Sequence, residues 1–262
     1  MGVLNITPDS FSDGGEFLST DKAIERGLQI AAEGAHIIDV GGESTHPGSQ
    51  AVTVQEELRR VIPVIENLHR ELDVPISIDT SKAEVARAAI EVGASIVNDV
   101  TGGRGDEQML PLVAEKKSAF ILMHMQGTPR TMQIQPRYTD VVAEISEFFR
   151  QQYARAIGLN IDPMAIAFDP GIGFGKTLEH NLELLAQLER LRVHDRALVV
   201  GVSRKSFLGK LIGSVEMSDR RIPVFALTSL LRGRGADVLR VHDVKENVHA
   251  LRVSEAILQA AK

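Results

Sequence analysis

Polar side chains of the types used in catalysis recur directly after short apolar segments of this 262-residue chain. Carboxylates, amides and cations end most of these segments: Asn5, Asp39, Asp79, Asn98, Asp99, His124, Asp169, Ser203, Arg204, Lys205, Arg240 and His242. An unpaired polar group inside a core would cost about 1–3 kcal/mol. Because the carboxyl ends of parallel strands meet at one edge, this pattern predicts a single small-molecule site.

The cations in this set predict that the site binds an anion. Arg240 and His242 alternate with Val241, so both side chains face the same side of a strand. Arg204 and Lys205 precede a helical segment, whose N-terminus adds positive potential. A diphosphate with Mg²⁺ fits such a site, because Mg²⁺ prefers oxygen ligands and often binds partly through substrate phosphates.

Other residues of the set have simpler interpretations. We interpret Asp39 and Asp99 as caps that hold the following turns through backbone N–H groups, and His124 as structural. The segment DPGIGFGKT (169–177) ends like a phosphate-binding P-loop, but Pro170 occupies a position where that motif needs glycine. What remains is a carboxylate and a glycine-rich loop with an exposed aromatic residue, Phe174, which suits close approach of a flat ligand.

Eight βα units are needed to position these residues. Short apolar runs alternate with stretches of helical periodicity, and a Gly-Ala pair at 34–35, 93–94 and 235–236 marks the end of a helix before a strand. The expected strands are Gly2 to Asn5, Ile37 to Val40, Pro75 to Ile78, Ile96 to Asn98, Phe120 to Met123, Ala165 to Phe168, Leu198 to Val202 and Val238 to Val241. The longest loops, at about 7–19, 41–53 and 126–138, all follow strands.

Length and composition agree with one α/β domain, a single-domain (β/α)8 TIM barrel, with an open doubly wound sheet as the competitor. The absence of cysteine excludes disulfides and thiolate metal sites and is typical of a cytoplasmic protein. A net charge of -6 and the lack of long apolar runs argue against nucleic-acid and membrane partners. Because a strand begins almost at Met1, we expect the native chain to extend upstream of it.

The sequence resembles the dihydropteroate synthase family over nearly its whole length. The matching motifs fall in order at the predicted strand ends: MGVLNITPDSFSDGG, GGEST, SIDTSK, IVNDVTGG, LMHMQGTP, DPGIGFGK, GVSRKSF and RVHDV. The resemblance implies condensation of 4-aminobenzoate with a dihydropterin that carries a hydroxymethyl diphosphate. The products would be diphosphate and 7,8-dihydropteroate for folate synthesis, with assistance from Mg²⁺. It also implies a homodimer.

The same motifs imply roles for individual residues. The pterin would bind Asp79, Asn98, Met123, Asp169, Lys205 and Arg240. The diphosphate would bind Asn5, His46, Arg240 and His242, with Mg²⁺ on Asn5. The aminobenzoate would bind Phe11, Thr45, Pro47, Gly173, Phe174, Ser203 and Lys205. Asp13 would lie near the reacting methylene, so that the catalytic set is Asn5, Asp13, Asp169 and Lys205. The two long early loops would exclude water.

One departure from the family pattern is His46, which stands where the family usually has arginine. Histidine loses its charge near neutral pH, whereas arginine keeps it. We therefore predict that substrate affinity weakens as the pH rises through the range in which histidine titrates.

Three other functions fit parts of the same pattern. A pterin-dependent methyltransferase domain would share the pterin contacts but would not need a diphosphate pocket. A non-catalytic pterin-binding homologue would bind without turnover, and His46 makes this reading more credible. An aldolase-like barrel would use Lys205 as a Schiff base, although the neighbouring Arg204 fits that chemistry less well.

Overall fold

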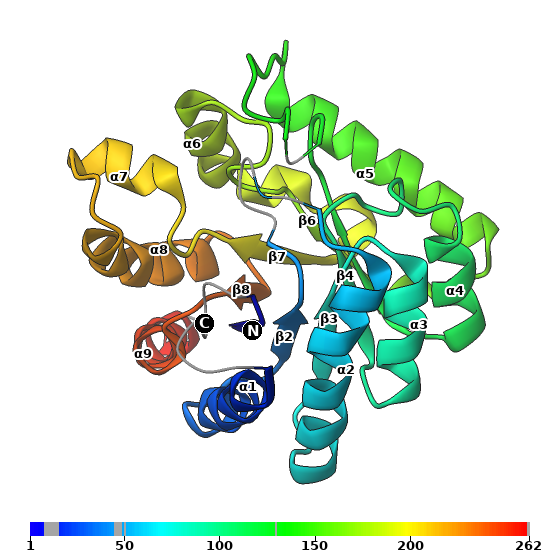
Figure 1. Cartoon of the computed structure of the whole chain (residues 1–262). Coiled ribbons are helices and arrows are strands. Elements are labelled where there is room, and N and C mark those ends of the chain that lie inside the picture. Colours follow the sequence, from blue (N-terminus) through cyan, green and yellow to red (C-terminus); the bar gives the residue numbers. More distant parts are fainter. Residues whose placement is uncertain (8–15, 45–48, 50, 129, 261–262) are drawn as a thin grey trace.

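The strands form a ring of parallel neighbours, and the helices surround it (Figure 1). The computed structural model describes residues 1–7, 16–44, 49, 51–128 and 130–260. Hydrogen-bonded neighbours follow chain order. The strands are β1 (Gly2–Asn5), β2 (Ile38–Gly41), β3 (Ile76–Asp79), β4 (Ile96–Asp99), β5 (Ala119–Met123), β6 (Ile166–Asp169), β7 (Ala197–Gly201) and β8 (Val238–Arg240).

The ring is closed by backbone contacts between its first and last strands. Gly2 and Val241 form a parallel bridge. The N–H of Val3 donates to the carbonyl of Val241 at 2.9 Å, and the N–H of Val241 donates to the carbonyl of Met1 at 3.0 Å. An open doubly wound sheet would leave these two strands apart, so the predicted (β/α)8 barrel is confirmed.

The described helices follow the strands as expected of βα units. They are α1 (Glu16–Ala32), α2 (Val54–Glu71), α3 (Ala83–Glu91), α4 (Met109–Lys116), α5 (Val141–Gly158), α6 (Leu178–Ala186), α7 (Ser206–Ile212), α8 (Arg221–Gly233) and α9 (Val244–Ala260). Gly34, Gly93 and Gly235 have φ of +98°, +120° and +90°, which side chains disfavour. The predicted left-handed turns between helices and strands are therefore confirmed.

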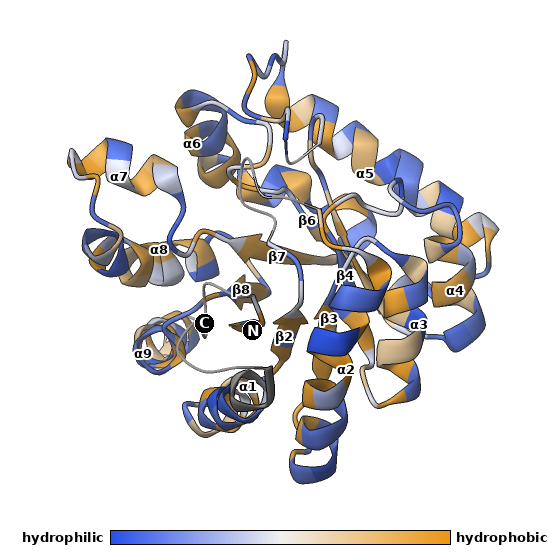
Figure 2. Cartoon of the chain, in the orientation of Figure 1, coloured by the Kyte–Doolittle hydropathy of each residue, from blue (hydrophilic) through white to orange (hydrophobic). Residues whose placement is uncertain are grey.

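The main core lies between the ring and its helices. Figure 2 shows the strands in hydrophobic colours and the helices in mixed colours, as helices with one buried face should be. Phe149 of α5 stacks on Phe168 of β6 with ring centroids 4.5 Å apart, and both side chains are fully buried. This packing fixes the strands whose ends carry the polar residues. No helix in the described ranges is long and apolar enough to span a bilayer.

Several strand ends differ from the prediction by one residue. Three strands predicted to end at Ile78, Asn98 and Phe168 continue to the next residue, in each case an aspartate. The parallel ladder includes these carboxylates, for example through the pairing of Asp169 with Met123. The acidic residues are therefore held by strand backbone rather than by the loops that follow.

Candidate active site

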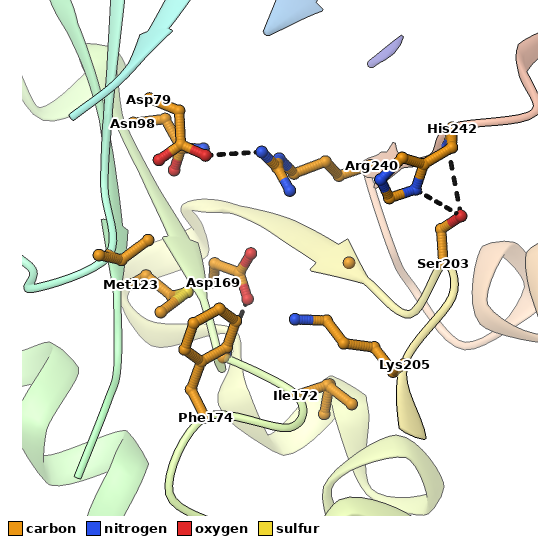
Figure 3. Close-up of a pocket in the computed structure, with 13 residues that line it drawn as sticks. Asp79, Asn98, Met123, Asp169, Ile172, Phe174, Ser203, Lys205, Arg240 and His242 are labelled. Atoms are coloured by element: carbon orange, nitrogen blue, oxygen red, sulfur yellow. Dashed lines mark hydrogen bonds and ion pairs between the residues drawn. The ribbon is translucent and has the colours of Figure 1, made fainter. Parts of the chain in front are cut away.

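One pocket at the carboxyl ends of the strands collects most of the predicted site residues. Figure 3 shows their side chains converging from β3, β4, β5, β6, β7 and β8 and the segments that follow these strands. The pocket is lined by Asp79, Asn98, Val100, Met123, Asp169, Gly171, Ile172, Phe174, Gly201, Ser203, Lys205, Arg240 and His242. Nine of these were predicted. Sequence reasoning missed Val100, Gly171, Ile172 and Gly201, since neither small nor aliphatic residues carry a chemical signal.

Predicted residues outside this lining fall into two groups. Asn5 and Gly173 are described, but they do not line the pocket. Phe11, Asp13, Thr45, His46 and Pro47 lie outside the described residues, so their roles remain predictions.

Asn5 nevertheless belongs to the same edge of the barrel. The strand register aligns Asn5 with Gly41, Gly41 with Asp79, and Asp79 with Asn98, in one row across four strands. A side chain at Gly41 would contact both neighbours, because its Cβ would lie 3.5 Å from the Oδ1 of Asn5 and from the Cβ of Asp79. Glycine at this position therefore leaves open the space between the amide and the carboxylate.

Arg240 links two buried carboxylates across the barrel mouth. Its Nε donates to Asp39 Oδ2 and its Nη2 donates to Asp79 Oδ2, both at 2.6 Å. Asn98 Nδ2 donates to the same oxygen of Asp39 at 3.2 Å. Burial raises the pKa of Asp79 to about 7, while the Arg240 guanidinium opposes that rise.

The interpretation of Asp39 as a turn cap is wrong. Its Oδ2 binds side chains of β4 and β8 instead of backbone N–H groups, and its buried Oδ1 has no partner among the described residues. The interpretation holds for Asp99, which accepts the N–H groups of Thr101 and Gly103 at 2.8 Å each. Both aspartates lie in short predominantly apolar segments that form strands, so only the fold distinguishes them.

The loop after β6 is built by glycines that no other residue could replace without strain. Gly171 has φ of +65°, and a Cβ there would lie 2.0 Å from the carbonyl oxygen of His124. This close approach lets Asp169 Oδ1 accept the N–H of Gly171 at 2.7 Å. Phe174, expected to be exposed, is only 8% exposed and packs with Val100 and three methionines. The loop therefore presents a buried ring to the pocket.

Lys205 is the residue directly before α7, and its side chain extends into the same pocket. Its Nζ lies 3.9 Å from the centroid of the Phe174 ring and points toward Asp169 (Figure 3). This ammonium group makes no hydrogen bond with any described residue. Burial lowers the pKa of Lys205 to about 8, with Arg240 adding to the effect and Asp169 opposing it. A partly buried cation whose donors are not used by the described residues is suited to bind an incoming polar ligand.

Arg204, expected at the same rim, does not line the pocket. It is in the left-handed region with φ of +61°, and its guanidinium faces Asp243 at 3.6 Å with 40% of its side chain exposed. One residue before Arg204, Ser203 Oγ lies 2.9 Å from His242 Nδ1. Ser203 and His242 therefore form the wall between β7 and β8.

His124 is structural, as predicted, and its partner is a residue that sequence reasoning did not single out. Lys176 Nζ lies 3.1 Å from His124 Nδ1 and donates to the carbonyl oxygens of Phe174 and His124 at 2.9 and 3.4 Å. Burial lowers the pKa of His124 to about 2, so its ring is neutral. A P-loop lysine would bind a phosphate, whereas Lys176 binds protein groups. This agrees with the conclusion from the sequence that the segment is not a P-loop.

Comparison with known proteins identifies the family. The family model described as "Pterin binding enzyme" matches residues 1–242. The dihydropteroate synthase of Escherichia coli K12 is 47% identical over 260 residues, which cover 99% of this chain and 92% of that protein. The crystal structure of the Yersinia pestis dihydropteroate synthase with a sulfonamide drug complex has a TM-score of 0.93 at 42% identity, with coverage of 99% and 94%. The Xanthomonas albilineans dihydropteroate synthase with 4-aminobenzoic acid has a TM-score of 0.93 at 44% identity, with coverage of 98% and 92%.

The barrel, the buried acid and amide pocket and these matches define a pterin-binding enzyme. Within that class, the chain belongs to the dihydropteroate synthase family. The predicted resemblance is therefore confirmed, and the aldolase and methyltransferase interpretations are not supported.

Proposed function

We propose that this chain condenses 4-aminobenzoate with (7,8-dihydropterin-6-yl)methyl diphosphate and releases diphosphate. The observation that carries the proposal is the convergence of Asp79, Asn98, Asp169 and Lys205 on one pocket. Carboxylates, an amide and a cation complement the adjoining donors and acceptors of a pterin edge. The neighbouring Phe174 and Met123 supply apolar surface for a flat ring.

The diphosphate would lie toward β8 and β1. Arg240 and His242 line that side of the pocket, and Asn5 lies on the strand that closes the barrel next to them. Arg240 would leave Asp79 to contact the pterin face or the diphosphate, because the pterin needs the same carboxylate. His46 would add a further contact to the diphosphate.

The donor set near Asn5 fits Mg²⁺. Among the described residues, no cluster of three or more His, Asp or Glu side chains could hold a metal. Mg²⁺ does not require one, because it usually keeps several waters and binds through substrate phosphates with one or two protein ligands. The amide oxygen of Asn5, unpaired among the described residues, would be such a ligand. When bound, the ion would neutralise charge on the departing diphosphate.

The reaction needs charge stabilisation rather than a protein nucleophile. The bond between the pterin methylene and the diphosphate oxygen breaks, the arylamine nitrogen bonds to the methylene, and that nitrogen loses a proton. Arg240 and His242 would stabilise the leaving diphosphate, while the pterin delocalises positive character on the methylene. Asp13 would lie near this carbon. The early loops would exclude water, which otherwise competes with the amine.

The second substrate would bind between the β6 loop and β7. Phe174, Ser203 and Lys205 line the pocket there, and Gly173 is close enough to Lys205 that a Cβ would lie 3.3 Å from its Cδ. Phe11, Thr45 and Pro47 would complete the aminobenzoate site.

The decisive experiment measures diphosphate release with both substrates and Mg²⁺, and repeats it without 4-aminobenzoate. We expect diphosphate and dihydropteroate in equal amounts, and little diphosphate when the amine is omitted. Tight pterin binding with no turnover at saturating Mg²⁺ would instead identify a non-catalytic homologue. Transfer of a methyl group to a corrinoid protein without diphosphate release would identify the methyltransferase.

We also propose that the chain is a cytoplasmic homodimer that pairs through α8 and α9. Leu230 of α8 and Val253 and Ile257 of α9 are 48%, 62% and 66% exposed, and the Arg232–Glu255 ion pair joins the two helices beside them. Large apolar side chains that cluster at a surface are typical of association sites. Sedimentation should give twice the 28.6 kDa monomer mass, and a monomer at all concentrations would contradict the pairing.

A further inference from the structure

One completely buried carboxylate lies beneath the pocket, out of reach of a ligand. Asp39 of β2 has no exposed surface and does not line the pocket, whereas Asp79 of β3 does. Along β2, Asp39 comes two residues before Gly41, the partner of Asp79 in the strand register. Residues two apart on a strand face the same side, so Asp39 lies one layer of side chains deeper in the barrel than Asp79.

Asp39 holds two of the side chains that do reach the ligand. Its Oδ2 accepts from Arg240 Nε at 2.6 Å and from Asn98 Nδ2 at 3.2 Å. Both donors belong to residues that line the pocket. Because an ionised carboxylate only accepts hydrogen bonds, Asp39 fixes the amide of Asn98 with its nitrogen toward β2, which leaves Oδ1 for a donor on the ligand.

Arg240 has two carboxylate partners among the described residues, and only one of them is accessible. Its Nη2 donates to Asp79 Oδ2 at 2.6 Å, and this ion pair crosses the mouth of the pocket (Figure 3). Burial lowers the pKa of Arg240, but the charges of Asp39 and Asp79 outweigh burial and leave the pKa raised. The arginine side chain is only 21% exposed, so loss of both partners would be unfavourable.

We propose that Asp39 is a positioning residue that stays paired with Arg240 and thereby releases Asp79 to the pterin ring. This inference rests on the proposed function, in which the ring takes the carboxylate of Asp79. In the empty enzyme the two aspartates share Arg240. When the ring binds, Arg240 gives up Asp79, while Asp39 still balances its charge and holds its Nε. The terminal nitrogens of Arg240 then turn to the diphosphate.

Binding of the two halves of the substrate tests this exchange. Asp39→Asn keeps the shape and an accepting oxygen but removes the charge, so a ring that takes Asp79 leaves Arg240 unbalanced. The Kd for 6-hydroxymethyl-7,8-dihydropterin, which lacks the diphosphate, should rise at least about tenfold. The Kd for inorganic diphosphate should stay within about threefold, because this anion itself balances Arg240. A pterin Kd within about twofold of wild type in the folded variant would overturn the proposal.

A rescue experiment distinguishes a counter-ion from a carboxylate that only supports the fold. Saturating inorganic diphosphate supplies Arg240 with a new anion. It should therefore restore the pterin Kd of Asp39→Asn to within about threefold of the wild-type value under the same conditions. If the loss persists with diphosphate bound, Asp39 serves only the shape of the barrel, and the proposal fails.

The matched control is Asp237→Asn. Asp237 also uses one oxygen, Oδ2, for two donors, the N–H of Leu198 and Nη2 of Arg192, both at 2.8 Å, and it does not line the pocket. Loss of its charge should leave both Kd values unchanged. An equal loss of pterin affinity in this control would assign the effect to general destabilisation and overturn the proposal.

Melting temperatures without ligand separate this inference from the proposed function. Asp39→Asn and Asp79→Asn each leave Arg240 with one carboxylate, whereas the double variant removes both. The decrease in melting temperature of the double variant should be at least about twice the sum of the two single decreases, because either carboxylate can substitute for the other. A double variant that fails to fold while both single variants fold is the same result at its limit.

Additive decreases, or failure of either single variant to fold, would overturn the shared counter-ion even in an active enzyme. If the wild type binds no pterin, the proposed function fails, and the melting comparison alone decides whether the two aspartates share Arg240.

Discussion

Two lysines on neighbouring loops of the barrel mouth have opposite surroundings. Lys176, in the loop after β6, has three acceptors within 3.4 Å, and its pKa is lowered to about 7 by burial. Lys205, after β7, is partly exposed. Its Nζ lies over the Phe174 ring, faces the charge of Asp169 and has no hydrogen bond to a described residue. The residue type is the same, and the two lysines differ in exposure and in the use of their donors.

The difference indicates which cation binds substrate. A buried ammonium whose donors are already used by the protein stabilises a loop, whereas one with unused donors gains its hydrogen bonds from a ligand. On this reasoning Lys176 supports the β6 loop from behind, and Lys205 contacts the pterin and the aminobenzoate. Substitution of each lysine should therefore affect different properties.

The largest effect is expected for Lys205→Ala. Loss of a charge-assisted hydrogen bond costs about 1.5–3 kcal/mol, which corresponds to a decrease in kcat/KM of about 10- to 150-fold. The melting temperature should not fall, because the Lys205 side chain has no hydrogen bond to a described residue to lose. Steady-state kinetics and thermal unfolding of the same preparation check both points. Near-normal kcat/KM would place Lys205 with Lys176 as a structural residue.

Asp169→Asn should lower kcat/KM by more than tenfold, about 1.4 kcal/mol. The amide oxygen can still accept the N–H of Gly171, so the loop should keep its conformation while the charge facing Lys205 is lost. Kinetics with circular dichroism separate these effects. A fully active, folded variant would show that the carboxylate is needed only for the loop.

The pH profile sharpens the comparison further. Burial lowers the pKa of Lys205 to about 8, so the free enzyme is mostly charged below that pH and loses the charge above it. We expect kcat/KM to fall about tenfold between about pH 7 and pH 9, given one proton per site. Residual activity of Lys205→Arg should lack this decrease. The same decrease in both proteins would assign it to another group.

Lys176→Met should change activity less than the preceding variants do. Its carbonyl partners would be left without a donor, at a cost of about 1–3 kcal/mol in the free energy of unfolding. At a temperature where the variant is folded, kcat/KM should remain within about threefold of wild type. Denaturant unfolding and kinetics test this division. A large kinetic loss in a stable variant would mean that Lys176 touches substrate.

The smallest effect is expected at His46, a third basic group, which the structure does not describe. His46→Arg should flatten the pH dependence of substrate affinity around neutral pH, a change of a few-fold, because arginine stays charged. Titration of pterin diphosphate binding at several pH values measures it. Identical profiles for the two proteins would remove His46 from the diphosphate site.

Whether a feature of this protein could be predicted from the sequence depends on how far apart along the chain the interacting residues lie. Strands, helix ends and the positions of Asp79 and Lys205 follow from local patterns, such as the Gly-Ala turns. The pairing of Asp39 with Arg240 joins residues 201 positions apart, and no local signal encodes it. Lys176 was missed for a related reason, since its role depends on acceptors at His124, 52 residues earlier. Sequence thus located the polar residues, but only the fold showed which of their hydrogen bonds are already used.

The most direct measurement is a crystal structure of the protein soaked with the pterin diphosphate. We predict that the ring lies against Asp79, Asn98 and Asp169, that Lys205 Nζ donates to the ligand, and that Lys176 keeps its three protein contacts. A ligand bound elsewhere at full occupancy, or one bound in the pocket with Lys205 unmoved on Phe174 and no contact to it, would contradict the assignment.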